Sequence, residues 1–208
     1  LEDIQRERKL TAEERQELKK YSRLADAFTP LAKGMNSEYA NQNTYDAIQV
    51  HGGSGFIMEY KCQRLYRDAR IFSIYEGTTQ LQVVAAIRYI SNGTYLGIIK
   101  EMLEKEVADE LKPLKARVVE MVNLYEQALE YVKEAQDQEM HDFLARRLYN
   151  MTCEIIMSLL ILEDATRSAE LFAKSANVYV RMAQANVFGE HAYITNFVKE
   201  DLPSFRAE

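Results

Sequence analysis

Residues 144–162, LARRLYNMTCEIIMSLLIL, decide the fold class. Apolar side chains recur there at steps of three and four residues, which is the spacing of one face of an α-helix. The stripe consists of Leu144, Leu148, Met151, Ile155, Leu159 and Leu162. A helix with one long apolar face must bury that face against other helices, so the stretch predicts a helical bundle.

One stretch before these residues and one after them repeat the pattern. The earlier stripe consists of Leu114, Val118, Met121 or Val122, Tyr125, Leu129 and Val132. The later one is rich in small residues, which let neighbouring helices approach closely. It consists of Ala165, Ala169, Phe172, Ala176, Val180, Ala183 and Val187. Together the three stripes predict an antiparallel bundle.

The first part of the chain is also predicted to be helical. Thr11 and Glu14 have the spacing of a capping box, so a helix should cover residues 12–28. Pro30 lacks an N–H group and suits the first turn of a second helix, which should end at Gly52. The expected apolar stripe of that second helix is Leu31, Met35, Tyr39, Asn43, Ala47 and Val50.

Shorter helices should follow the first glycines. One is expected over about 63–71, and another from Thr78 or Thr79 to about residue 92. The fold prediction is therefore all-α, with one helical domain over residues 1–92 and a second antiparallel helical bundle over residues 93–208.

Composition excludes several function classes. The 208 residues include only 8 Gly and 3 Pro, too few turn formers for an all-β sandwich. A formal net charge of −6 argues against a general nucleic-acid binder. No stretch approaches the roughly 20 apolar residues that cross a bilayer, so a membrane role is not expected. Cys62 and Cys153 are expected to be reduced, and the three scattered histidines predict no metal site.

Three neighbouring segments carry residues suited to chemistry. They are YDAIQVHGGSGF at residues 45–56, RLYRDAR at residues 64–70 and IYEGTTQ at residues 74–80. Glycines without Cβ atoms let backbone amides approach a bulky anion. The glycines do not follow a strand, however, so a Rossmann motif is excluded, and a simple helix-capping loop explains them equally well.

The order and spacing of the three segments resemble the C-terminal domain of the acyl-CoA dehydrogenase family. The resemblance extends from about Leu24 to Ile90. It implies an acyl-CoA dehydrogenase-like C-terminal helical bundle, preceded in the parent enzyme by a helical domain and a β-domain. It also implies FAD as cofactor and a homo-oligomer in which FAD lies partly across a subunit interface.

The resemblance implies two sets of cofactor-binding residues. Gln49, Val50, His51, Gly52 and Gly53 match the stretch that contacts the ADP part of an FAD bound by a neighbouring subunit. Thr78, Thr79 and Gln80 match a helix start that touches the dinucleotide of its own subunit. Unpaired N–H groups and the positive end of the helix dipole favour pyrophosphate at such a position. A simple N-cap at Thr78 is compatible with the same pattern.

The family's catalytic base matches Glu76, and the neighbour that lies along the thioester matches Gly77. The implied reaction removes the α proton of an acyl-CoA while the β carbon loses a hydride to the flavin, which gives a trans-2-enoyl-CoA. Burial beside flavin and acyl chain would raise the pKa of the base toward neutrality. For Arg67, Asp68 and Arg70 we expect an ion-paired structural hinge.

The chain departs from the family pattern at both ends. More than a hundred residues follow Gly93, and we expect this extension to pack against protein rather than dock on a membrane. The upstream domains are expected to lie before Leu1, so the fragment alone should be inactive.

Partners and alternatives follow from the same resemblance. It implies acyl-CoA as substrate, an electron-transferring flavoprotein as electron acceptor, and a cytoplasmic location, or the mitochondrial matrix in a eukaryote. An acyl-CoA oxidase and a non-catalytic helical oligomerisation module remain as alternatives.

Overall fold

The computed structural model describes residues 3, 5 and 8–206, and these contain helices but no strand. The chain divides into two compact units, Leu1–Ala86 and Ile87–Glu208. The helical structure of the described residues confirms the all-α prediction. The predicted domain limits, 1–92 and 93–208, stay a prediction.

The first unit is organised by one long helix, α2 (Ala12–His51). Three short elements pack against it: α3 (Gly53–Phe56), α4 (Cys62–Ala69) and the 3-10 helix η1 (Arg70–Ser73). Helix α5 (Thr79–Ser91) follows and crosses the boundary between the units.

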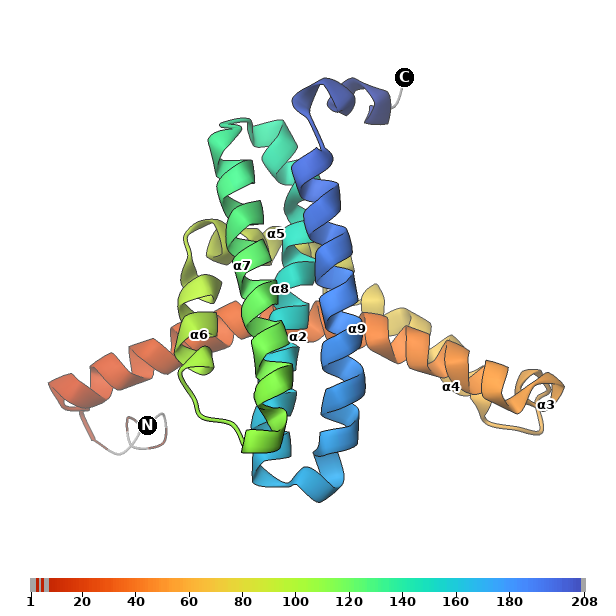
Figure 1. Ribbon diagram of the computed structural model, residues 1–208. Helices are drawn as coiled ribbons and strands as arrows, with labels where there is room; N and C mark the ends of the chain where they lie inside the picture. Colours follow the sequence, from red (N-terminus) through yellow and green to blue (C-terminus); the bar gives the residue numbers. More distant parts are fainter. Residues whose placement is uncertain (1–2, 4, 6–7, 207–208) are drawn as a thin grey trace. The chain divides into compact units, whose positions relative to one another are not determined.

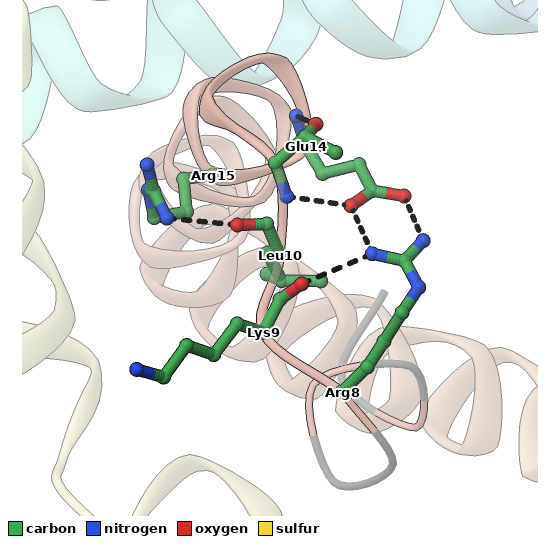
Figure 2. A network of polar contacts seen from close by, with 6 residues as sticks. Arg8, Lys9, Leu10, Glu14 and Arg15 are labelled. Atoms are coloured by element: carbon green, nitrogen blue, oxygen red, sulfur yellow. Dashed lines mark hydrogen bonds and ion pairs between the residues drawn. The ribbon is translucent and has the colours of Figure 1, made fainter.

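The start of α2 is fixed by a polar network (Figure 2). The backbone N–H of Glu14 donates to Thr11 Oγ1 at 3.2 Å, and the N–H of Thr11 donates to the Glu14 carboxylate at 2.8 Å. Arg8 donates to both oxygens of the same carboxylate, at 2.8 and 2.6 Å. The capping box predicted from the sequence is therefore confirmed, with Arg8 as an additional partner.

The predicted break at Pro30 is wrong, because α2 continues through it. Pro30 cannot donate a hydrogen bond to the preceding turn, which normally destabilises a helix interior. Its ring is buried, however, together with Ala27 and Leu31, and the Thr29 hydroxyl donates to the Ala25 carbonyl at 2.8 Å. Burial of this face outweighs the missing backbone hydrogen bond.

The apolar stripe of α2 is shorter than predicted. Leu31 and Met35 are buried, but Asn43 is exposed and Val50 is 85% exposed. No side chain of α2 after Ser37 is fully buried, although α3 and α4 pack against this part of the helix.

The second unit is an antiparallel bundle of long helices. Helices α7 (Lys112–Glu134), α8 (Gln138–Arg167) and α9 (Ala169–Asn196) pack against one another, and α6 (Thr94–Leu103) packs on α8 (Figure 1). Two 3-10 helices, η2 (Asp109–Leu111) and η3 (Lys199–Phe205), complete it.

The six apolar residues of the stripe in 144–162 are all buried in α8, as predicted. The predicted stripe of α7 is buried except at one position, where Ala128 is buried and the predicted Leu129 is half-buried.

The third predicted stripe is partly wrong. Ala165 belongs to the end of α8, and Ala169 and Phe172 at the start of α9 are exposed. The turn at Ser168 interrupts the helix and resets its phase, which periodicity alone does not show.

Both cysteines are free thiols, and burial raises the pKa of the Cys153 thiol to about 12. In the part of the chain that the structure describes, no helix is long and apolar enough to cross a membrane. No group of three or more His, Cys, Asp or Glu side chains suited to a metal ion occurs among residues 3, 5 and 8–206.

Candidate functional site

The predicted base lies in a tight turn between η1 and α5. Glu76 and Gly77 are two consecutive residues with positive φ, 53° and 96°. The left-handed conformation is unusual for a residue with a side chain and is maintained only where surrounding contacts fix it. This turn is therefore a fixed feature of the first unit.

Two side chains from different helices hold the turn. Lys33 of α2 donates from Nζ to the Gly77 carbonyl. Gln82 of α5 donates from Nε2 to the carbonyls of Gly77 at 3.3 Å and Glu76 at 3.4 Å. The φ of 96° at Gly77 is one that residues with a side chain rarely adopt, so glycine there meets a conformational need.

The turn borders an open groove of about 400 Å³ in the first unit. Its lining combines an apolar wall with polar groups: Ala32, Lys33, Asn36, Ser37, Phe72, Tyr75 and Glu76. The Glu76 side chain is exposed, and its carboxylate has no hydrogen bond or ion pair within residues 3, 5 and 8–206. It is available to a molecule that enters the groove.

The residues after the turn begin α5. Thr78 Oγ1 accepts from the Leu81 N–H at 3.4 Å, as an N-cap does. Thr79 is only 8% exposed, and its hydroxyl donates to Glu38 Oε1 at 2.7 Å. Gln80 is exposed. Of the three predicted cofactor contacts at this helix start, Thr79 is thus already engaged within the first unit.

The glycine segment forms the end of α2. Gly52 has a φ of 58° and its N–H donates to the Gln49 carbonyl at 3.1 Å. A Cβ at Gly55 would lie 2.8 Å from the Ile48 carbonyl oxygen, so Gly55 is needed for the close approach of α3. A Cβ at Gly53 would meet no described residue within 4 Å, so its backbone faces open space in the part of the chain that the structure describes.

The polar side chains before these glycines make hydrogen bonds to residues one turn earlier in α2. His51 Nδ1 lies 2.8 Å from the Ala47 carbonyl, and Gln49 Nε2 donates to the Tyr45 hydroxyl at 3.0 Å. Gln49, Val50 and His51 are all exposed.

The two predicted sets of cofactor residues are far apart within the first unit. The groove is lined by α2 residues up to Ser37, and the glycine segment begins twelve residues later at Gln49. At 1.5 Å per residue this separation is about 18 Å along α2. One chain therefore presents them as two separate regions.

The predicted ion-paired hinge is wrong. Arg67, Asp68 and Arg70 are exposed, and among the described residues Asp68 has no ion pair. Arg70 instead donates to the Ser73 hydroxyl at 2.6 Å, and the segment is anchored by a hydrogen bond from Asn41 Nδ2 to the Ala69 carbonyl at 3.1 Å.

Three residues at the site are not indicated by the sequence: Lys33, Glu38 and Gln82. Lys33 and Glu38 lie in the middle of a helix about forty residues before the turn they support. Their spacing from the turn carries no local signal, because only the fold brings the middle of α2 next to the turn and the first residue of α5.

Two family models match the chain, one for each half. Residues 91–202 match the family model "Acyl-CoA dehydrogenase C terminal", and residues 7–89 match "Acyl-CoA dehydrogenase, C-terminal domain". The chain belongs to the acyl-CoA dehydrogenase family.

Curated relatives resemble a short part of the chain. The caffeyl-CoA reductase-Etf complex subunit CarC of Acetobacterium woodii is 54% identical over 52 residues, which are 25% of this chain and 14% of that protein. A 3-(aryl)acrylate reductase of Clostridium sporogenes is 50% identical over 58 residues, 28% of this chain and 15% of that protein. The chain thus spans about one seventh of the length of these relatives.

Two solved structures are similar to the chain. An acyl-CoA dehydrogenase family protein from Porphyromonas gingivalis is 37% identical, with a TM-score of 0.52, and the match covers 55% of this chain and 98% of that one. An acyl-CoA dehydrogenase complexed with FAD from Bacillus anthracis is 22% identical, with a TM-score of 0.55, over 86% of this chain and 33% of that one. The second likeness supports the fold alone.

Proposed function

We propose that this chain is the C-terminal helical part of an FAD-dependent enzyme that converts acyl-CoA thioesters to trans-2-enoyl-CoA. One observation carries the proposal: Glu76 presents an unpaired carboxylate at the rim of a partly apolar groove, in a left-handed turn that Lys33 and Gln82 hold. Membership of the acyl-CoA dehydrogenase family supports it.

In this proposal Glu76 removes the α proton of the bound thioester. FAD, when bound, supplies the acceptor for the hydride that leaves the β carbon. The carboxylate is exposed in the chain by itself, so the desolvation that would make it a stronger base must come from the substrate and from the other domains. Gly77, beside the base, would lie along the thioester.

The residues present fit a dinucleotide at two places. Gly53 faces open space next to the exposed Gln49 and Val50, so a phosphate could approach its backbone without a clash. Thr78 and Gln80 lie at the start of α5, where helix N–H groups favour pyrophosphate.

The two places are about 18 Å apart along α2, and following the family resemblance we assign them to two different FAD molecules. The chain would contact its own FAD through Thr78 to Gln80 and a neighbour's through Gln49 to Gly53. This assignment requires a homo-oligomer, and it makes the isolated chain inactive because the rest of each FAD pocket lies elsewhere.

A second candidate is the same chemistry in the opposite direction. The A. woodii and C. sporogenes relatives are named as reductases of caffeyl-CoA and of an aryl acrylate. In that direction Glu76 would return a proton to the α carbon. An electron-transferring flavoprotein is the proposed electron partner in both directions, which the name of the CarC relative supports. The proposed location is the cytoplasm, or the mitochondrial matrix in a eukaryote.

The test is Glu76→Gln in the protein that carries this chain together with its upstream domains. We expect enoyl-CoA formation to fall by at least about 100-fold, since a positioned general base contributes that much, while the flavin absorbance is retained. Glu59→Gln, at another exposed glutamate of the first unit, is the matched control and should keep full activity. Unchanged activity of Glu76→Gln would exclude it as the base. Assays from acyl-CoA and from enoyl-CoA separate the two directions.

A further inference from the structure

The outer face of α9 carries an exposed stripe of mostly apolar residues. Its members recur at alternating steps of four and three residues on the side of the helix opposite the buried face, and all are exposed: Leu171, Ser175, Val178, Met182, Ala185, Gly189, Ala192 and Asn196. We name these eight residues the α9 seam. Leu171 is 70% exposed, Val178 67% and Met182 42%.

The α9 seam has the pattern of a coiled-coil helix. Steps of four and three repeat every seven residues, and the seam sustains them over three heptads without a charged residue. An ordinary solvated helix face carries charges. The length, about 38 Å at 1.5 Å per residue, is sufficient for a stable helix pair.

Gly189 gives independent support for close approach of another helix. Glycine in a helix interior is less stable than alanine, so it needs a reason. Among the described residues of the second unit, a Cβ at Gly189 would meet nothing within 4 Å, so packing within this unit does not require the glycine. A second backbone packed on this position would supply a reason.

The order of large and small residues points to the occupant. The large apolar side chains, Leu171, Val178 and Met182, lie in the first half of the seam, whereas Ala185, Gly189 and Ala192 in the second half are small. In an antiparallel pair of identical helices, the first half of each helix lies against the second half of the other. Pairing Met182 with Ala185 of a second copy brings Val178 opposite Gly189, and Ser175 opposite Ala192 of that copy.

The flanking residues agree with this register. It brings Arg181 beside Phe188 of the second copy, where a guanidinium can lie over an aromatic ring, and Phe172 beside Tyr193 of that copy. A register shifted by one heptad would instead place Arg181 beside Arg181 of the second copy. It would also crowd Met182 against Val178 of that copy. Charge and size therefore favour the same register.

We propose that α9 binds α9 of a second copy of this chain as an antiparallel, two-fold symmetric helix pair centred between Met182 and Ala185. A single patch that is complementary to itself is the requirement for a closed dimer. The proposal does not depend on the flavin chemistry of the first unit, so either can fail without the other.

The first test is the molar mass of the chain by light scattering. We expect Met182→Glu to halve the mass of the wild-type particle, because it places charges on both sides of the two-fold axis. Val119→Glu is the matched control: Val119 on α7 is also 42% exposed but lies outside the seam, and its variant should keep the wild-type mass. Equal masses for the two variants, or a monomeric wild-type chain, would overturn the proposal.

The second test fixes the register by disulfide formation in a Cys62→Ser background. Mixed Val178→Cys and Gly189→Cys chains should form a covalent dimer containing one of each, several-fold faster than either variant alone. Within the proposed pair, two copies of position 178 are about 16 Å apart along the axis and cannot be bridged. Faster linkage of Leu171→Cys with Gly189→Cys would contradict this register, and no linkage in either mixture would exclude the antiparallel pair.

Discussion

At the scale of single residues, the clearest electrostatic feature is Glu14 at the start of α2 (Figure 2). The two hydrogen bonds from Arg8, with the backbone N–H of Thr11, hold the pKa of its carboxyl down to about 2, from an ordinary value of 4.5. Because the pKa in the folded chain is depressed, this group stabilises the folded state fully above pH 4.5. That stabilisation is lost as the pH falls from 4.5 to 2.

We therefore expect Arg8→Ala to raise the pKa of Glu14 toward 4.5. The first turn of α2 should then fray more between about pH 2 and pH 4.5 than in the wild-type chain. A carboxyl titration followed by NMR measures the pKa directly. Glu139, whose carboxyl pKa is lowered by its hydrogen bond from Arg206, is the internal control and should titrate alike in both proteins. A Glu14 midpoint that does not move would show that Thr11 and the helix end alone stabilise the carboxylate.

At the scale of elements, α7 and α8 are joined by a buried pair of hydroxyl groups. Thr152 Oγ1 lies 2.9 Å from the Tyr125 hydroxyl oxygen and donates to the Leu148 carbonyl at 2.8 Å. Thr152 and Tyr125 have no exposed surface, and burial raises the pKa of the Tyr125 hydroxyl. A buried hydroxyl without a partner is costly, whereas two apolar groups of the same shape are tolerated.

Thr152→Val should therefore destabilise the chain by about 1–3 kcal/mol, because it leaves the Tyr125 hydroxyl without its partner. Adding Tyr125→Phe should restore part of that loss. Urea unfolding of the two single variants and the double variant measures the free energies. If the effects of the two changes simply add, the hydroxyls do not interact.

At the scale of the whole molecule, the two units differ in how much core they contain. The second unit buries large side chains from four helices, among them Tyr95, Met121, Leu144 and Ile194. The first unit leaves several large apolar side chains exposed, including Phe56 at 76% and Met58 at 86%. Exposed apolar residues on this scale are typical of surfaces that other chains or domains cover.

We accordingly expect residues 87–208 to fold without the first unit. Thermal unfolding of this segment, followed by near-UV circular dichroism of its tyrosines, should be a single cooperative transition. Helical far-UV signal without a near-UV transition would show instead that the bundle needs the first unit for specific packing.

The sequence alone predicted those features of the fold that depend on residues close together in the chain. The periodic stripe in 144–162, the capping box at Thr11 and the helix end at Gly52 depend on residues within one or two turns of each other. The spacing of the glycine segment and of residues 74–80 likewise carries the family resemblance without any tertiary information.

Only the tertiary structure decided the features that depend on distant residues. The continuity of α2 through Pro30 rests on the burial of one helix face. The left-handed turn at Glu76 rests on Lys33, forty-four residues from the Gly77 carbonyl that it binds. Only the structure shows that the α9 seam is exposed and that the opposite face of α9 is the buried one. Periodicity shows that a helix has an apolar face, but the three-dimensional packing determines which faces find a partner within the chain.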